Sequence, residues 1–158
     1  MEDMHMHLKK GVTDISIMQK YVEKCKEMKL NRVLFLDHGN RMSPKHTPVL
    51  NETKVIDKFF ENIKIVKENN PDIEINAGIE SDFSYDEEFK EKEIKILKSY
   101  PFDYIIGSVH GMEKVNYINY LQANIDMIKT YPINIVGHLK LRKEYEQYKE
   151  KIEEVFAR

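Results

Sequence analysis

The stretch Val33-Leu34-Phe35-Leu36-Asp37-His38 decides the fold, because an apolar run is followed directly by a carboxylate and an imidazole. The run is typical of a strand that is buried on both faces, as in a parallel sheet. Before it, apolar residues recur every three or four positions from Ile15 to Met28, which predicts an amphipathic helix capped by Thr13 or Asp14. A helix that leads into a buried strand indicates a βα architecture.

The same alternation of helix and strand continues along the chain. Further strands are predicted around residues 4–8, 73–79, 104–107 and 133–136, and further helices around 55–66, 89–97, 118–128 and 141–155. Such alternation implies right-handed crossovers and a mostly parallel sheet. About five βα units are fewer than the eight of a closed barrel. We therefore expect an α/β fold, an incomplete and distorted (βα) barrel.

The composition is that of one domain, and residues 1–158 are expected to form a single unit. The formal net charge of −2 argues against a nucleic-acid-binding surface. Mixed charges such as Lys90-Glu91-Lys92-Glu93 predict solvated helix faces. The single Cys25 excludes an internal disulfide, and no apolar run approaches the ~20 residues that span a bilayer. We therefore expect a cytoplasmic protein without membrane contact.

Ligand-type side chains lie at or just past five of the predicted strands. His5 and His7 are two positions apart, so both side chains leave the same face of one strand. The remaining candidates are Asp37-His38, Glu80, His110 and His138. Strand ends converge on the face where βα proteins carry their chemistry, and imidazole and carboxylate bind borderline divalent metals. The pattern predicts a metal site, and with it an enzyme.

Taken one at a time, these residues have plainer interpretations. His-x-His can be a pair of half-exposed histidines at a frayed terminus, and Asp37-His38-Gly39-Asn40 is also good turn chemistry. Glu80 alone can be a solvated or capping residue. A carboxylate can bridge two cations, however, so Glu80 is the residue that a multinuclear site needs. We expect Asp3 to accept a hydrogen bond from a ligating imidazole, and His46 to be exposed.

The motifs, in this order, resemble those of the PHP family, the polymerase and histidinol phosphatase domains, which are metal-dependent phosphoesterases. The similar motifs are Asp-Met-His-Met-His at 3–7, Leu-Asp-His-Gly at 36–39, Gly-Ile-Glu-Ser-Asp-Phe at 78–83, Ile-Gly-Ser-Val-His at 106–110 and Val-Gly-His at 136–138. Stretches 78–83 and 102–110 are especially similar to the histidinol-phosphatase branch. The resemblance covers nearly the whole chain and implies a distorted seven-unit (βα) barrel.

The resemblance also implies a ligand set at the strand ends. His5, His7 and Glu80 resemble the ligands of one metal. Glu80, His110 and His138 resemble those of a second, with Glu80 as the bridge. The ions, Mn, Zn or Fe, would polarise a small phosphomonoester similar to histidinol phosphate, and a metal-bound hydroxide would attack phosphorus in line.

The chain departs from the family pattern around the third metal. His38 resembles a ligand of that metal, but the family's final Asp-x-His motif is missing before Arg158, and Thr13 stands where a further histidine is expected. We therefore expect two metal ions and a lost or crippled third site. His38, reoriented toward substrate, is then expected to be catalytic together with Asp37 and Glu80.

Two basic residues are candidates for binding the phosphate group of a substrate. Lys140 occupies a position where the family often has an aspartate, and Arg41 follows the Asp37-His38 motif. A guanidinium pairs bidentately with phosphate oxygens. Either residue is equally well explained as a surface charge.

Three functions remain open from the sequence. The first is a small phosphatase of the histidinol-phosphatase type, as in histidine biosynthesis. The second is a truncated, catalytically idle metal-binding module, and the third is a phosphoesterase for another substrate, such as phosphotyrosine or a nucleotide. A sheet short of strands leaves an exposed edge, which the terminal helix or a second subunit would cover. We expect a homodimer there, unless the chain is a fragment of a longer protein.

Overall fold

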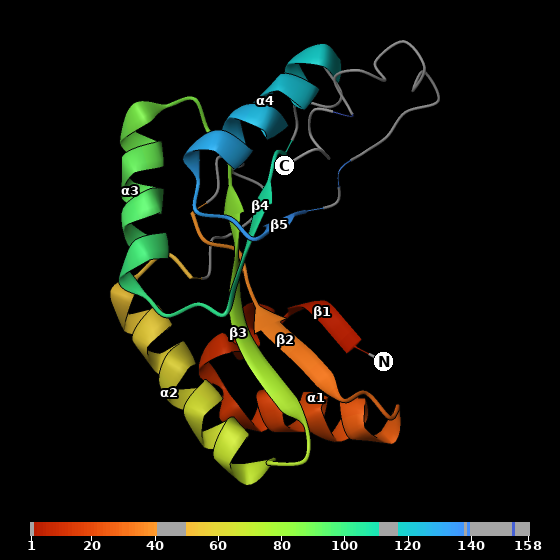
Figure 1. Cartoon of the computed structure of the whole chain (residues 1–158). Coiled ribbons are helices and arrows are strands. Elements are labelled where there is room, and N and C mark those ends of the chain that lie inside the picture. The colour runs from red at the N-terminus through yellow and green to blue at the C-terminus, as the bar shows by residue number, and fades with distance from the viewer. Residues whose placement is uncertain (1, 41–49, 111–116, 138, 140–152, 154–158) are drawn as a thin grey trace.

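The computed structural model describes residues 2–40, 50–110, 117–137, 139 and 153. Five parallel strands form one sheet in the sequential order β1-β2-β3-β4-β5. Their bounds are Glu2–His7 for β1, Arg32–Leu36 for β2, Glu74–Asp82 for β3, Tyr104–Ser108 for β4 and Ile135–Val136 for β5. The sheet curls into a half-barrel (Figure 1), which confirms the predicted incomplete (βα) barrel.

The longest strand, β3, joins two parts of this sheet. Residues 74–77 pair with β2, whereas residues 78–82 pair with β4. Stagger between neighbouring strands is what lets a sheet coil toward a barrel. The strand was predicted to end at Ile79. It ends at Asp82, because its pairing with β4 continues to Asp82 opposite Ser108. Glu80 therefore lies inside the strand and not beyond its end.

Strand β1 contains a bulge that the sequence did not indicate. Asp3 pairs with Val33 and Met6 pairs with Phe35, so β1 has one residue more than β2 between these two pairs. A β-bulge bends its strand and redirects the side chains beside it. The irregularity includes His5, which is one of the predicted metal ligands.

Helices follow the first four strands. Their bounds are Lys9–Thr13 for the 3-10 helix η1, Ile15–Glu27 for α1, Thr53–Asn69 for α2, Glu87–Ser99 for α3 and Tyr117–Thr130 for α4. Asp14 caps α1 as predicted, by accepting a hydrogen bond from the amide of Ser16. Helices α2 and α3 lie along one side of β3 (Figure 1). None of the described helices is long and apolar enough to cross a membrane.

Apolar side chains pack on both faces of the central strands. Val33 and Phe35 belong to the larger core. The alternating residues Leu34 and Leu36 face the other way and pack with Ile106. Strand β2 is thus buried on both faces, as its apolar run predicts.

The two edge strands, β1 and β5, line a groove of about 490 Å³, with Met4, Met28 and Ile135 among its walls. The predicted homodimer at this edge remains a prediction. The predicted last helix, 141–155, lies outside the described residues apart from Glu153.

One of the charges predicted to be solvated is buried. Glu93 on α3 is 0% exposed, whereas Glu91 and Lys92 of the same run are exposed. The Glu93 carboxylate accepts hydrogen bonds from Ser81 and Asn40, which are distant in the sequence. The prediction was wrong for Glu93 because a run of alternating charges does not reveal such partners.

Candidate metal centre

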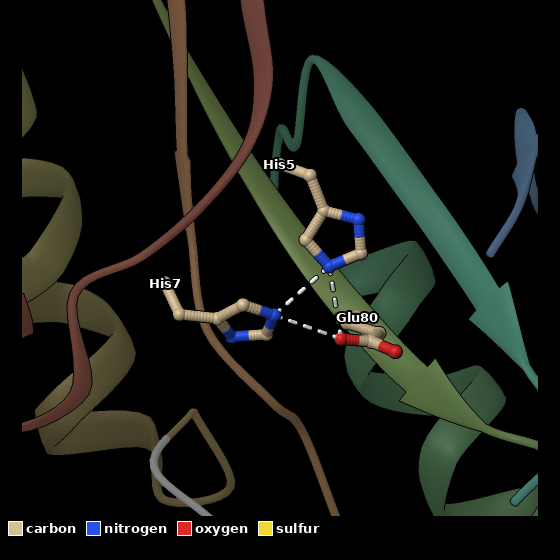
Figure 2. Close-up of side chains that lie close together, drawn as sticks. All are labelled: His5, His7 and Glu80. Carbon is tan, nitrogen blue, oxygen red and sulfur yellow. Dashed lines mark hydrogen bonds and ion pairs between the residues drawn. The ribbon is translucent and has the colours of Figure 1, made fainter. Parts of the chain in front are cut away.

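Strand β1 presents two imidazoles to a carboxylate on β3 (Figure 2). The Nε2 atoms of His5 and His7 lie 3.2 and 3.0 Å from Oε2 of Glu80. The two Nε2 atoms are themselves 2.9 Å apart. The ligand atoms of the three residues all lie within 4.8 Å of one another. The structure therefore brings together the three side chains that were predicted to share one metal.

A bound cation would satisfy these three side chains better than hydrogen bonds among them can. At most one of the two Nε2 atoms can carry a hydrogen in the 2.9 Å gap between them, so at least one lone pair faces the cluster. Glu80 is 1% exposed, and a buried carboxylate needs compensating positive charge or hydrogen bonds. Imidazole nitrogens and a carboxylate oxygen are ligands for Zn, Mn or Fe. The residues present therefore suit a divalent metal ion.

Histidines from two more strands reach the same carboxylate. His38 Nδ1, just past β2, lies 3.3 Å from Oε2 of Glu80. His110 Nε2, just past β4, lies 3.6 Å from the other oxygen, Oε1, which also accepts a hydrogen bond from Ser108 Oγ at 2.6 Å. The two oxygens of Glu80 thus face different groups of ligands. That division is what a bridging carboxylate requires.

His110 is held in position by Asp82 at the end of β3. The Nδ1 atom of His110 lies 2.9 Å from Oδ1 of Asp82, which is 2% exposed. Because an ionised carboxylate accepts and does not donate, the hydrogen belongs on Nδ1. The Nε2 lone pair of His110 then points to the Glu80 side. A carboxylate behind a histidine in this way orients the ring and makes it a stronger ligand.

Asp37 lies behind His7 at the end of β2. Its Oδ1 atom is 3.6 Å from His7 Nδ1 and accepts a hydrogen bond from the amide of His38 at 2.8 Å. Its other oxygen, Oδ2, is buried and has no hydrogen-bond partner among the described residues. Burial alone would lower the pKa of His7, but the adjacent carboxylates of Asp37 and Glu80 outweigh it and raise that pKa to about 9. The cluster therefore favours positive charge.

The remaining predicted residues fare differently. Asp3 was predicted to accept a hydrogen bond from an imidazole, but within the part of the chain that the structure describes it accepts one from the backbone amide of His5, at 3.1 Å. Its position at the bulge explains the local contact. The other predicted residues, Arg41, His46, His138 and Lys140, lie outside the described residues and stay predictions.

Sequence reasoning gave no role to Asp82 or Ser108, although both contact the cluster. A signal for each was present. Asp82 is two positions after Glu80 and Ser108 two before His110, and in a strand such spacing puts both side chains on one face. Asp82 and Ser108 also pair with each other across β3 and β4.

Comparison with known proteins agrees with this geometry. The model of the PHP domain family matches residues 3–158, nearly the whole chain. The chain belongs to the PHP domain family. Members of this family depend on metal ions, and membership supports a phosphoesterase-type function for this PHP domain. Among curated proteins, none matches the chain in sequence.

Among solved structures, this PHP domain is similar to a candidate histidinol phosphatase, HisK, from Listeria monocytogenes. The two share 15% sequence identity and superpose with a TM-score of 0.60. The match covers 99% of this chain and 78% of the Listeria protein. At this identity the likeness establishes the fold.

Proposed function

We propose that this PHP domain is a metal-dependent phosphatase that hydrolyses a small phosphomonoester, with histidinol phosphate as the first candidate substrate. The observation that carries the proposal is the Glu80 carboxylate, which has imidazoles next to both of its oxygens. Two divalent ions, of Mn, Zn or Fe, are proposed there. When bound, such ions activate water and neutralise charge on a phosphoester.

The chain's own residues prepare the site for this chemistry. Glu80 supplies an oxygen to each half of the cluster, and Ser108 fixes its orientation through the hydrogen bond to Oε1. Asp82 holds the proton of His110 on Nδ1 and keeps Nε2 as a lone-pair donor. At the end of β2, His38 is proposed to act on the substrate side of the cluster, whereas Asp37, buried behind His7, is proposed to act through that histidine. None of these groups has to serve as a covalent nucleophile.

Binding of the substrate phosphate is proposed to depend on Arg41 and Lys140. Arg41 follows directly on the described turn 37–40, which carries His38. A guanidinium and an ammonium would both attract a phosphomonoester dianion. The near-neutral net charge of −2 argues for a small phosphorylated substrate over a nucleic acid.

The test combines metal content with turnover. We expect elemental analysis of the purified protein to find about two metal equivalents, in keeping with a dinuclear hydrolase. Glu80→Ala and His110→Ala are each expected to abolish hydrolysis of histidinol phosphate and of p-nitrophenyl phosphate. Glu74→Ala, at the exposed start of the same strand, serves as the matched control and should keep full activity.

Three outcomes would change the conclusion, each in a different way. Full activity in both the Glu80 and the His110 variants would rule out the dinuclear mechanism. Bound metal without turnover of either substrate would favour the alternative of an idle metal-binding module. Turnover of the aryl phosphate alone would leave the chain a phosphatase and direct the search to other substrates, such as phosphotyrosine or a nucleotide.

A further inference from the structure

Helix α3 inserts a carboxylate between two strands that carry the metal centre. Glu93 is completely buried, and among the described residues no lysine, arginine or histidine forms an ion pair with it. Burial raises the pKa of the Glu93 carboxyl above its ordinary range, although hydrogen bonds from Ser81 and Asn40 oppose the rise. An acid buried without a cation costs stability, so its place in the fold calls for an explanation.

Both oxygens of Glu93 are used, and each holds a segment next to a candidate ligand. Oε1 accepts a hydrogen bond at 2.7 Å from Oγ of Ser81, which follows Glu80 on β3. Oε2 accepts a hydrogen bond from Asn40 Nδ2 at 2.7 Å, two residues after His38. The carboxylate therefore links the strand of Glu80 to the turn of His38.

The turn after β2 is packed tightly against this carboxylate. A Cβ atom added at Gly39 would lie 2.6 Å from Oε1 of Glu93, so a larger residue there would push this carboxylate away from its position. In the same turn the Gly39 amide donates to the carbonyl of Glu80 at 2.9 Å, and the Glu80 amide donates to the carbonyl of Asp37 at 3.0 Å. The backbone from Asp37 to Gly39 thus extends β2 alongside Glu80.

We propose that Glu93 is a positioning residue for the metal centre, which fixes the turn carrying His38 against the strand position of Glu80. The role rests on the proposed metal centre. Glu93 does not contact the reacting groups itself. It acts through Asn40 and Ser81, and its loss would let the turn move away from Glu80. The metal ligands would then have to be reordered at the moment of binding, which weakens affinity.

The test compares two substitutions of Glu93 with a matched change on the same helix. Glu93→Met keeps the volume but removes both acceptors. Glu93→Gln keeps an acceptor for Asn40, and its amide can donate to Ser81, because a hydroxyl also accepts. Leu97→Ala, one turn later and also buried, destabilises α3 without touching the turn.

Two readouts separate positioning from general stability. The first is the dissociation constant for Mn²⁺ of the metal-free full-length protein, measured by titration calorimetry. The second is hydrogen exchange of the Gly39 amide. For Glu93→Met we expect the dissociation constant to rise about tenfold. This is the lower end of the loss of metal affinity seen when a residue that supports a metal ligand is replaced. The Gly39 amide should also exchange faster in Glu93→Met than in the wild type. In Glu93→Gln and in Leu97→Ala we expect both the dissociation constant and the exchange rate of Gly39 to stay at their wild-type values.

The outcomes are distinguishable. Wild-type affinity and wild-type Gly39 exchange in Glu93→Met would overturn the role of Glu93, and so would an equal loss of affinity in Leu97→Ala. Failure of the wild-type protein to bind Mn²⁺ would instead overturn the proposed function. The exchange of Gly39 would in that case still decide whether Glu93 holds the turn.

Discussion

At the scale of single residues, the carboxylates of this site differ in what they face. Glu80 faces imidazole nitrogens directly, whereas Asp82 and Asp37 lie behind imidazoles, on the side of Nδ1. All three are almost completely buried. Burying a carboxylate costs free energy unless cationic or hydrogen-bonding partners lie beside it. Two layers of carboxylate around the histidines therefore favour binding of a cation.

The hydrogen bond between Asp82 and His110 gives a prediction at this scale. Asp82→Ala removes the acceptor that fixes the ring of His110, so we expect the affinity for Mn²⁺ to fall about 10- to 100-fold. Asp82→Asn, whose amide oxygen still accepts, should lose less. Titration calorimetry of the metal-free protein measures both constants.

Asp126→Ala provides the comparison, because Asp126 is a carboxylate that accepts a hydrogen bond from Tyr85 on another part of the surface. Its affinity for Mn²⁺ should equal that of the wild type. An Asp82→Ala protein with wild-type affinity would show that the ring of His110 needs no support.

The sequence predicted which candidate ligands lie near the strand ends, but it did not predict which side chains from other elements support them. The period of a strand placed His5 and His7 on one face, and the resemblance to the PHP family implied that Glu80 joins them, as the structure shows. The burial of Glu93 was not predicted, because its partners Ser81 and Asn40 come from other elements. Side chains that meet across elements follow from tertiary packing, which a local charge pattern does not contain.

At the scale of elements, apolar runs and periodicity predicted the type and order of the five strands and of helices α1 to α4, but not the 3-10 helix η1. Strand β2 and the cap of α1 at Asp14 agree with the prediction to within a residue. The extension of β3 to Asp82 was missed because polar residues near a strand end normally indicate solvent. The bulge in β1 was missed because it depends on how two strands pair, and not on the residues of either one.

Helix α3 offers a prediction about stability. Asp86 caps this helix by accepting a hydrogen bond from the amide of Phe89 at 2.8 Å. Asp86→Ala is expected to lower the free energy of unfolding by about 1 kcal/mol, the usual cost of a lost cap. Guanidinium denaturation measures the change. Glu91→Ala, exposed in the middle of the same helix, should stay close to the wild type, and an equal loss there would contradict the capping role.

At the scale of the whole molecule, the candidate ligands come from separate parts of the sheet. His5 and His7 lie on β1, Glu80 lies on β3, and His110 follows β4. A ligand that binds the folded state and not the unfolded state raises the midpoint of thermal unfolding. A metal ion held by these strands would therefore stabilise the sheet as a unit.

Thermal denaturation tests this consequence. Adding Mn²⁺ at about 100 times its dissociation constant should contribute about 2.7 kcal/mol and raise the midpoint by about 5–10 °C for a domain of this size. A chelator should reverse the shift. In the double variant His5→Ala/His7→Ala, which lacks two ligands of one of the two proposed ions, the shift should be reduced, and an unchanged shift there would place the bound ions elsewhere in the protein.

The divided pairing of β3 has a consequence for how the chain completes its fold. The β1–β2 half and the β4–β5 half share β3. Among the described histidines, His5, His7 and His38 belong to the first half and His110 belongs to the second. A chain in which one half has formed and the other has not would offer Glu80 an incomplete ligand set. An ion that needs ligands from both halves would therefore be fully coordinated only in the finished sheet, and its binding would distinguish native molecules from half-folded ones.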